Sequence, residues 1–260
     1  MLFGVLSALL AQAPVATAPA APPAPAESTT TGSVSLGAIW LTGNSETVTL
    51  SLGASALRKT PDWIYGFKLS GAYGRSTDPV TGVRSVSALN GSVSARVDRR
   101  FGPVPSLFVE GVVDTDHLKS IEWRPTGTLG VSLLLVDEKE GDFQAAAFRV
   151  DLGFRGGREY RFQYYPTALD LPDQTIAAPV TGLALRYALT HDTIFTDELT
   201  ALVNVPDGPR LLLTNLAKVA TKVYKSLSFT VSFGIAEDSA PPPGKVQLDT
   251  TLTVALELAL

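Results

Sequence analysis

The sequence contains no cysteine, so disulfide bonds, cysteine metal sites, thiol nucleophiles and a lipoprotein acylation site are all excluded. It also has no run of about twenty apolar residues, the length that a membrane-spanning helix needs. Basic residues are not in excess, since 25 Asp and Glu outnumber 21 Lys and Arg, whereas a nucleic-acid-binding protein normally carries a basic stripe. We therefore expect no nucleic acid partner and no cofactor.

The beginning of the chain differs from the rest in composition. Residues 1–13, MLFGVLSALLAQA, are apolar and end in the triplet Ala11-Gln12-Ala13, which predicts a secretory signal peptide. Pro14 follows directly, so cleavage as late as residue 26 stays open. Residues 14–31 are rich in Ala, Pro and Thr with almost no charge, which predicts a flexible or polyproline-like linker. One domain, residues 32–260, remains.

That domain consists of amphipathic segments separated by turn residues. We count twelve segments, at residues 33–41, 46–58, 62–75, 83–98, 105–116, 121–136, 143–156, 180–190, 193–205, 210–222, 225–236 and 247–260. Most are longer than the roughly five or six residues typical of strands in globular proteins. A membrane-spanning strand needs about nine to eleven residues, so the lengths favour a strand that crosses a bilayer.

Each segment has one apolar face. In the third segment Trp63, Phe67 and Tyr73 alternate with Lys68 and Ser70. The opposite face is mostly Ser, Thr, Gly and Ala with occasional charges, which suits a confined lumen better than bulk water. The pattern predicts an all-β fold, a single antiparallel up-and-down transmembrane β-barrel of about 12 strands. A soluble lipocalin-like barrel is the alternative fold.

The connections also alternate in length. Every second connection, beginning with residues 59–61, is short, as expected of periplasmic turns, and the longest, residues 157–179, is on the opposite side. The aromatic residues in that connection suggest that part of it extends a strand. Segment 247–260 alternates to its last residue, and we expect it to close the barrel against segment 33–41.

Strand alternation assigns equal numbers of basic and acidic residues to the lumen, nine of each. A balanced set in a confined space should form ion pairs, because an unpaired charge there is costly. The predicted lumen network is Lys68, Arg84, Arg96, Glu110, Asp114, Arg124, Arg149, Asp151, Arg155, Arg186, Glu198, Lys218, Asp249 and Glu257. Lys222, Asp98, Asp116 and Glu122 also point inward. A lumen plugged by these pairs is one interpretation, and a narrow channel for small solutes is the other.

An outer-membrane hydrolase is the rival class of function. His117 lies close to Asp114, Asp116 and Ser120, so an Asp–His or Ser–His pair is conceivable there. However, adjacent strand residues point to opposite faces, which separates Asp116 from His117. The carboxylates Asp114, Asp116 and Glu122 could bind a divalent cation. Most such clusters are simply solvated, and we expect neither catalysis nor a metal site.

Several of these residues resemble a known family. The turn Thr42-Gly43-Asn44, Trp63 at the start of the third segment, the stretch from Arg124 to Gly130, and Lys245 with Asp249 are similar to the YdiY-like family of salt-induced outer membrane proteins, domain of unknown function 481. The resemblance covers residues 33–260. It implies an envelope or osmotic role in the outer membrane of a Gram-negative bacterium.

The same resemblance implies the partners. These are outer-membrane lipids, lipopolysaccharide and, during insertion, the barrel assembly machinery, with the folded protein a monomer. The sequence departs from the pattern at one place, because related barrels end in Phe or Trp and Leu260 stands here.

Overall fold

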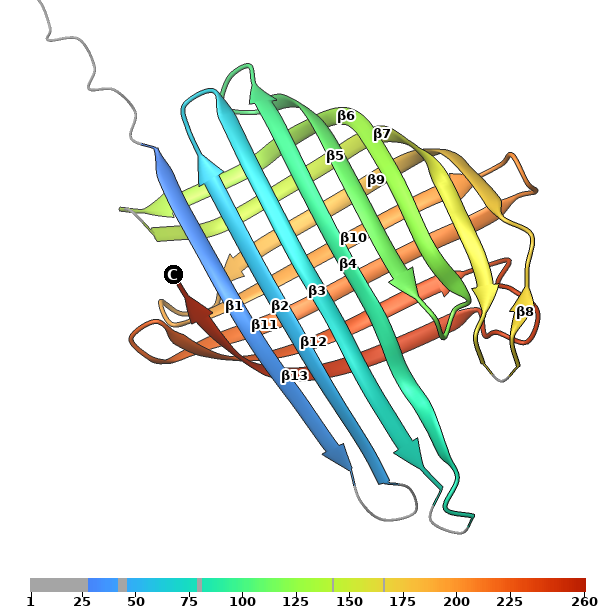
Figure 1. Ribbon diagram of the computed structural model, residues 1–260. Coiled ribbons are helices and arrows are strands. Elements are labelled where there is room, and N and C mark those ends of the chain that lie inside the picture. Colours follow the sequence, from blue (N-terminus) through green and yellow to red (C-terminus); the bar gives the residue numbers. More distant parts are fainter. Residues whose placement is uncertain (1–27, 42–45, 79–80, 142, 166) are drawn as a thin grey trace, which may run out of the picture.

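Thirteen β-strands make up the described part of the chain, and all of them except β8 form one closed antiparallel barrel. The computed structural model describes residues 28–41, 46–78, 81–141, 143–165 and 167–260. Figure 1 shows the barrel from the side, with the strands of the front wall crossing those of the rear wall. Among the described residues there is no helix long and apolar enough to cross a membrane.

The strands are longer than those of most globular proteins. They are β1 (Thr29–Leu41), β2 (Glu46–Lys59), β3 (Trp63–Thr77), β4 (Arg84–Arg100), β5 (Pro105–Asp116), β6 (Ile121–Glu140), β7 (Phe143–Gln163), β8 (Leu169–Asp170), β9 (Gln174–Ala188), β10 (Thr193–Asn204), β11 (Arg210–Tyr224), β12 (Leu227–Asp238) and β13 (Leu248–Ala259). The twelve barrel strands have 12 to 21 residues each. Since a tilted strand crosses a bilayer in about nine to eleven residues, several strands extend beyond that thickness.

Each barrel strand pairs with its neighbours in the sequence, and the first pairs with the last. β1 and β13 form the closing seam, from Ser33 opposite Ala259 to Gly37 opposite Ala255. β8 is the extra strand, and it pairs only with the end of β7, at Phe162 and Gln163. The predicted fold class, an antiparallel barrel of about 12 strands, is therefore confirmed.

All twelve predicted segments correspond to barrel strands, with differences at the ends. β7 continues to Gln163, into the connection predicted at residues 157–179. β1 begins at Thr29, so it includes the last residues of the predicted linker. The predicted signal peptide, most of the linker and the turn Thr42-Gly43-Asn44 lie outside the described residues.

The two ends of the barrel differ. We call the end where β1 begins and β13 finishes the terminal end, and the opposite end the far end. The connections at the terminal end are short, at residues 60–62, 101–104, 141–142, 189–192 and 225–226. The longest connections, between β7 and β9 and between β12 and β13, are both at the far end. This is the alternation that the sequence predicts for an up-and-down barrel.

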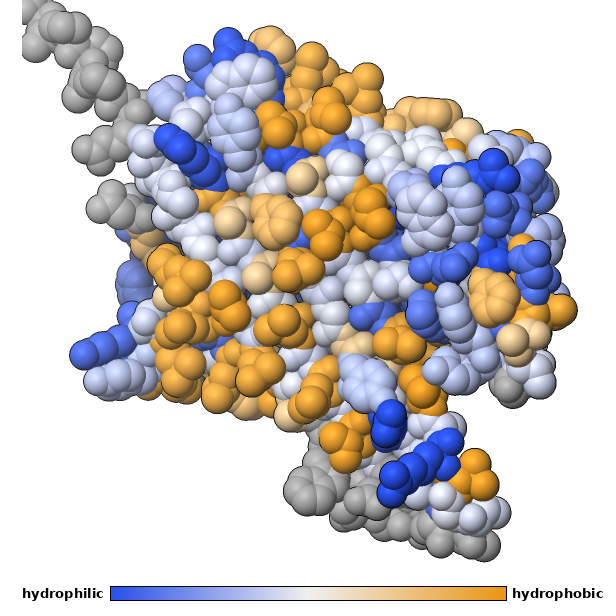
Figure 2. All heavy atoms as spheres, in the orientation of Figure 1, coloured by the Kyte–Doolittle hydropathy of each residue, from blue (hydrophilic) through white to orange (hydrophobic). Residues whose placement is uncertain are grey.

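The outer wall is apolar because the barrel is a single layer of sheet with nothing packed outside it. On β13, Leu252 and Leu256 are 59% and 51% exposed, while Thr253 and Ala255 face inward. Figure 2 shows apolar side chains gathered over the front wall and hydrophilic ones toward the end that carries β8. A continuous exposed apolar wall of this kind needs an apolar surrounding medium.

The seam offers a test of barrel closure at Gly37. An added Cβ there would lie 2.8 Å from the Val254 carbonyl oxygen and would also collide with Ser51 Oγ. We expect Gly37→Val to lower the free energy of unfolding by about 1–3 kcal/mol, because backbone must move to accept the side chain. Urea unfolding in detergent micelles measures this. Gly111→Val is the matched control, since a Cβ at Gly111 meets no atom within 4 Å. Equal losses in both variants would contradict the expectation.

Candidate functional site

An ion pair between Lys68 and Glu198 crosses the lumen from wall to wall. Lys68 on β3 donates from Nζ to the two carboxylate oxygens of Glu198 on β10, at 2.9 and 2.8 Å. Five strands separate β3 from β10 in each direction around the ring, so the two strands stand opposite each other. The contact therefore joins opposite walls of the barrel. Both side chains stay more than half exposed, at 63% and 52%.

A second group of charges lies against the wall formed by β4, β5 and β7. Arg96 donates from Nη2 to Asp98 at 2.7 Å and from Nη1 to Asp151 at 2.6 Å. Its guanidinium carbon is 3.9 Å from the ring centre of Phe108, an inward-facing and buried aromatic residue. Arg149 contacts Asp151 at 3.3 Å. These contacts fix Arg96 in one position, because its donors and its flat face are both engaged.

Two further pairs complete the middle of the lumen. Arg155 contacts Glu110 at 3.2 Å and donates to Thr128 Oγ1 at 2.9 Å. Lys218 on β11 donates to Glu257 on β13 at 3.1 Å. We call the charged residues of this middle region the waist: Lys68, Arg96, Asp98, Glu110, Arg149, Asp151, Arg155, Glu198, Lys218 and Glu257. Five cations therefore face five carboxylates.

A buried carboxylate organises the charges nearer the far end. Glu159 has no exposed surface, and three arginines from three strands surround it. Arg124 on β6 contacts it at 3.1 Å, Arg210 on β11 at 3.2 Å, and Arg161 on β7 through Nε. A carboxylate taken out of water this fully needs such partners, because an isolated buried charge costs several kcal/mol.

Other polar groups balance the three arginines. Arg124 also donates to Asp114, at 2.7 Å, and Arg210 also pairs with Asp238. Gln174 accepts hydrogen bonds from Arg161 and Arg210 through Oε1, at 3.0 and 2.9 Å. We call Asp114, Arg124, Glu159, Arg161, Gln174, Arg210 and Asp238 the far-end cluster. It contains three cations and three carboxylates, so it is neutral overall.

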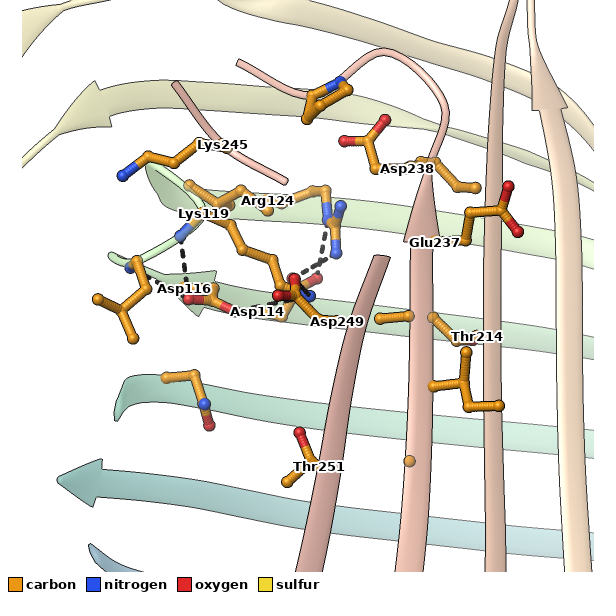
Figure 3. Close-up of a pocket in the computed structure, with 18 of the residues that line it drawn as sticks. Asp114, Asp116, Lys119, Arg124, Thr214, Glu237, Asp238, Lys245, Asp249 and Thr251 are labelled. Carbon is orange, nitrogen blue, oxygen red and sulfur yellow. Dashed lines mark hydrogen bonds and ion pairs between the residues drawn. The ribbon is translucent and has the colours of Figure 1, made fainter. Parts of the chain in front are cut away.

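A cavity of about 650 Å³ lies beside the far-end cluster. Figure 3 shows its charged lining, with Asp114 on β5, Arg124 on β6 and Asp249 on β13 directed toward one another. Lys119, from the connection between β5 and β6, contacts Asp249 on β13 at 3.1 Å. Pro242, from the connection between β12 and β13, is buried and also lines the cavity. The lumen therefore has open space beside the far-end cluster.

Arg84 was predicted to face the lumen, but the strand register places it on the outer face. The prediction counted alternate residues back from Arg96 without interruption. A β-bulge interrupts the pairing of β3 and β4 between Gly74 and Arg75, because β4 carries one extra residue. Beyond the bulge the faces of β4 are exchanged, and Arg84 stands opposite Thr77 on the face of Arg75. Arg84 therefore faces outward rather than into the lumen.

The other thirteen residues of the predicted lumen network lie on the inner face. All of them except Arg186 form an ion pair within the described part of the chain. The prediction omitted Glu159, Arg161, Arg210 and Asp238. Glu159 and Arg161 continue the alternation that begins at Asp151 and Arg155, so extending the seventh segment would have found them. Arg210 comes near Glu159 because the barrel wall curves, and no sequence pattern predicts this curvature.

His117 lies at the far end without a catalytic partner. Its ring stacks on Tyr164, with ring centres 4.0 Å apart. Within the described parts of the chain, no hydrogen bond joins the imidazole to a hydroxyl or carboxylate group. Burial raises the pKa of the Tyr164 phenol, and the carboxylate of Glu122 raises it further. Ser120 is buried, and its Oγ has no hydrogen-bond partner among the described residues.

The predicted carboxylate cluster does not converge on one point. Asp114 pairs with Arg124, and Asp116 accepts hydrogen bonds from the backbone N–H groups of Leu118 and Lys119. Among the residues that the structure describes, no group of three or more His, Asp or Glu side chains could hold a metal ion.

Comparison with known proteins identifies the family. The profile of the family described as "Protein of unknown function, DUF481" matches residues 34–259. The chain belongs to this family. The resemblance drawn from the first hairpin and Trp63 is thereby confirmed. No curated protein matches the chain.

Several solved barrels have a similar fold at low identity. The NanC porin is 9% identical with a TM-score of 0.45, over 88% of this chain and 97% of the porin. The KdgM porin in complex with disordered oligogalacturonate is 12% identical with a TM-score of 0.42, over 87% of this chain and 98% of the porin. The translocator domain of the autotransporter NalP from Neisseria meningitidis is 12% identical with a TM-score of 0.37, over 89% of this chain and 87% of that domain. Function must therefore be argued from the residues of this chain.

Glu159 provides a test of the far-end cluster. Glu159→Gln removes the charge that three buried or half-buried arginines share, and we expect it to lower the free energy of unfolding by about 3–5 kcal/mol. The midpoint of urea unfolding in detergent measures the loss. Glu138→Gln is the control, because Glu138 is exposed near the terminal end of β6, away from the far-end cluster. An unchanged midpoint for Glu159→Gln would show that the cluster does not stabilise the barrel.

Proposed function

We propose that this protein is a monomeric barrel of the Gram-negative outer membrane whose lumen is held closed at the waist by ion pairs. Its role is then that of an envelope barrel that does not pass solutes while these pairs are intact. The family description leaves the function open, so the proposal depends on the outer wall and on the waist.

The outer wall supports insertion into a membrane. Aromatic residues stand exposed near both ends of the wall, among them Trp63 and Tyr224 toward the terminal end and Trp123 and Phe154 toward the far end. Aromatic side chains in these positions are typical of the two interfaces of a bilayer. The apolar residues between them would contact lipid tails. The barrel assembly machinery would insert such a chain, and lipopolysaccharide would surround its outer rim.

The waist supports closure. Lys68 and Glu198 join opposite walls, and the second group of charges, around Arg96, occupies the space beside them. A strongly selective open pore more often carries an excess of one sign of charge, whereas the waist is balanced. The ion pair between Lys68 and Glu198 is the single observation on which the proposal most depends.

The same ion pair favours a second candidate, a narrow channel that opens. Lys68 and Glu198 are both more than half exposed. An exposed pair contributes only about 0.2–1 kcal/mol, so thermal motion can break it. The buried contacts of Glu159 have no such freedom. If the waist opens, small solutes would pass when the pair between Lys68 and Glu198 is broken.

Conductance across a planar lipid bilayer tests closure. We expect the wild-type protein to show rare or no current steps, and the double variant Lys68→Ala/Glu198→Ala to show frequent steps of one size. The control is Asp137→Ala/Lys139→Ala, which removes an ion pair at the terminal end of β6. Frequent wild-type steps equal to those of the double variant would contradict closure and support the channel. A monodisperse product purified without detergent would contradict the membrane assignment.

A further inference from the structure

The charge of the lumen changes along its length. At the waist and in the far-end cluster, each basic residue lies within ion-pair distance of a carboxylate. At the terminal end, four lumen-facing cations have no ion pair within the described residues: Lys59, Arg100, Arg186 and Lys222. We call these four residues the terminal cation ring.

Strand direction explains why the four cations gather at one mouth. β2, β4, β9 and β11 all run toward the terminal end, and each carries an inward-facing cation within its last three residues. Lys59 and Arg100 are the final residues of β2 and β4. Alternation then places each cation inward. Arg100 follows the inward Asp98, for example, and Lys222 follows the inward Lys218 in the same way.

Three of the four cations lie close enough to affect one another. Lys139, Arg186 and Arg100 all repel the charge of Lys59, whereas Asp137 attracts it. Asp137 is nevertheless engaged elsewhere, because it accepts a hydrogen bond from Gln144 at 2.6 Å and lies 3.7 Å from Lys139. Asp137 therefore offsets only part of the positive charge around Lys59.

Arg186 shows that donors at this mouth remain available. Its Nε donates to the backbone oxygen of Gln144 at 3.5 Å, the outer limit of a hydrogen bond. Guanidinium and ammonium groups held together without counter-charges concentrate positive potential, and low-dielectric walls focus it further. Such a mouth attracts anions, and guanidinium groups bind carboxylate and phosphate oxygens with two hydrogen bonds each.

We propose that the terminal cation ring is a binding site for a multivalent anion that carries several phosphate or carboxylate groups. The four cations come from both sides of the ring, β2 and β4 on one side and β9 and β11 on the other. A monovalent anion cannot contact both sides, whereas a molecule with spaced anionic groups can. In the orientation expected of a barrel with both chain ends in the periplasm, this mouth opens to the periplasm.

Isothermal titration calorimetry of the full chain in detergent tests the site. Tripolyphosphate and citrate are the two probes, and they separate phosphate from carboxylate chemistry. We expect wild-type protein to bind at least one probe at low ionic strength and to lose affinity as salt increases. Lys59→Gln/Arg186→Gln/Lys222→Gln should weaken binding by about tenfold or more, since the three substitutions remove charge-assisted hydrogen bonds to the anion.

The matched control removes two cations at the opposite mouth. Lys119→Gln/Lys245→Gln changes basic residues near the far-end cavity and should leave the affinity within about twofold of wild type. Mobility on a gel before and after boiling verifies that each variant is folded. The absence of binding by folded wild-type protein, or equal losses in the triple variant and the control, would overturn the proposal.

The test is independent of whether the lumen conducts. Lys68→Ala/Glu198→Ala removes the pair that crosses the waist but leaves the terminal cation ring intact, so its affinity for the probe should match that of wild type. A conducting protein that binds the anion would contradict only the closed lumen. A closed protein that binds neither probe would contradict only the anion site.

Discussion

Closure of the sheet is the constraint on which the rest of the structure depends. Once β1 pairs with β13, every strand has one face toward the outside and one toward a lumen that only other strands of the same chain surround. An inward charge then has three possible partners: water, a ligand or another inward charge. The ion pairs of the waist and of the far-end cluster follow from this geometry, because small Ser, Thr and Gly neighbours leave room for long charged side chains to reach across.

The two charge clusters do different physical work. Glu159 is fully buried, so its three arginines offset a large desolvation cost and hold β6, β7 and β11 in fixed relation. Lys68 and Glu198 are half exposed, so their contact costs little to form and little to break. The far-end cluster therefore acts as a structural anchor, while the pair across the waist has the weakness that a reversible closure requires.

The sequence predicts the structure correctly wherever inward and outward residues alternate along a strand without interruption. Strand number, the apolar outer wall and the closing partners all follow from alternation, which is why the fold could be predicted. Arg84 shows where alternation fails, since one extra residue in β4 exchanges its faces and no residue type marks the bulge. Glu159 could have been placed inward by continuing β7. The contact between Glu159 and Arg210 could not have been predicted, because it depends on strand tilt and ring curvature rather than on any local pattern.

Ionic strength should act on the parts of this lumen unequally. Salt shortens the screening length from about 10 Å at 0.1 M to about 3 Å at 1 M, but only where solvent reaches the charges. Lys68 and Glu198 meet that condition, and Glu159 with its arginines does not. Rising salt therefore weakens the contact that joins opposite walls while the anchor near the far end keeps its strength. The barrel would stay folded under conditions that loosen its waist, because the residues that close the lumen are not the residues that hold the fold together.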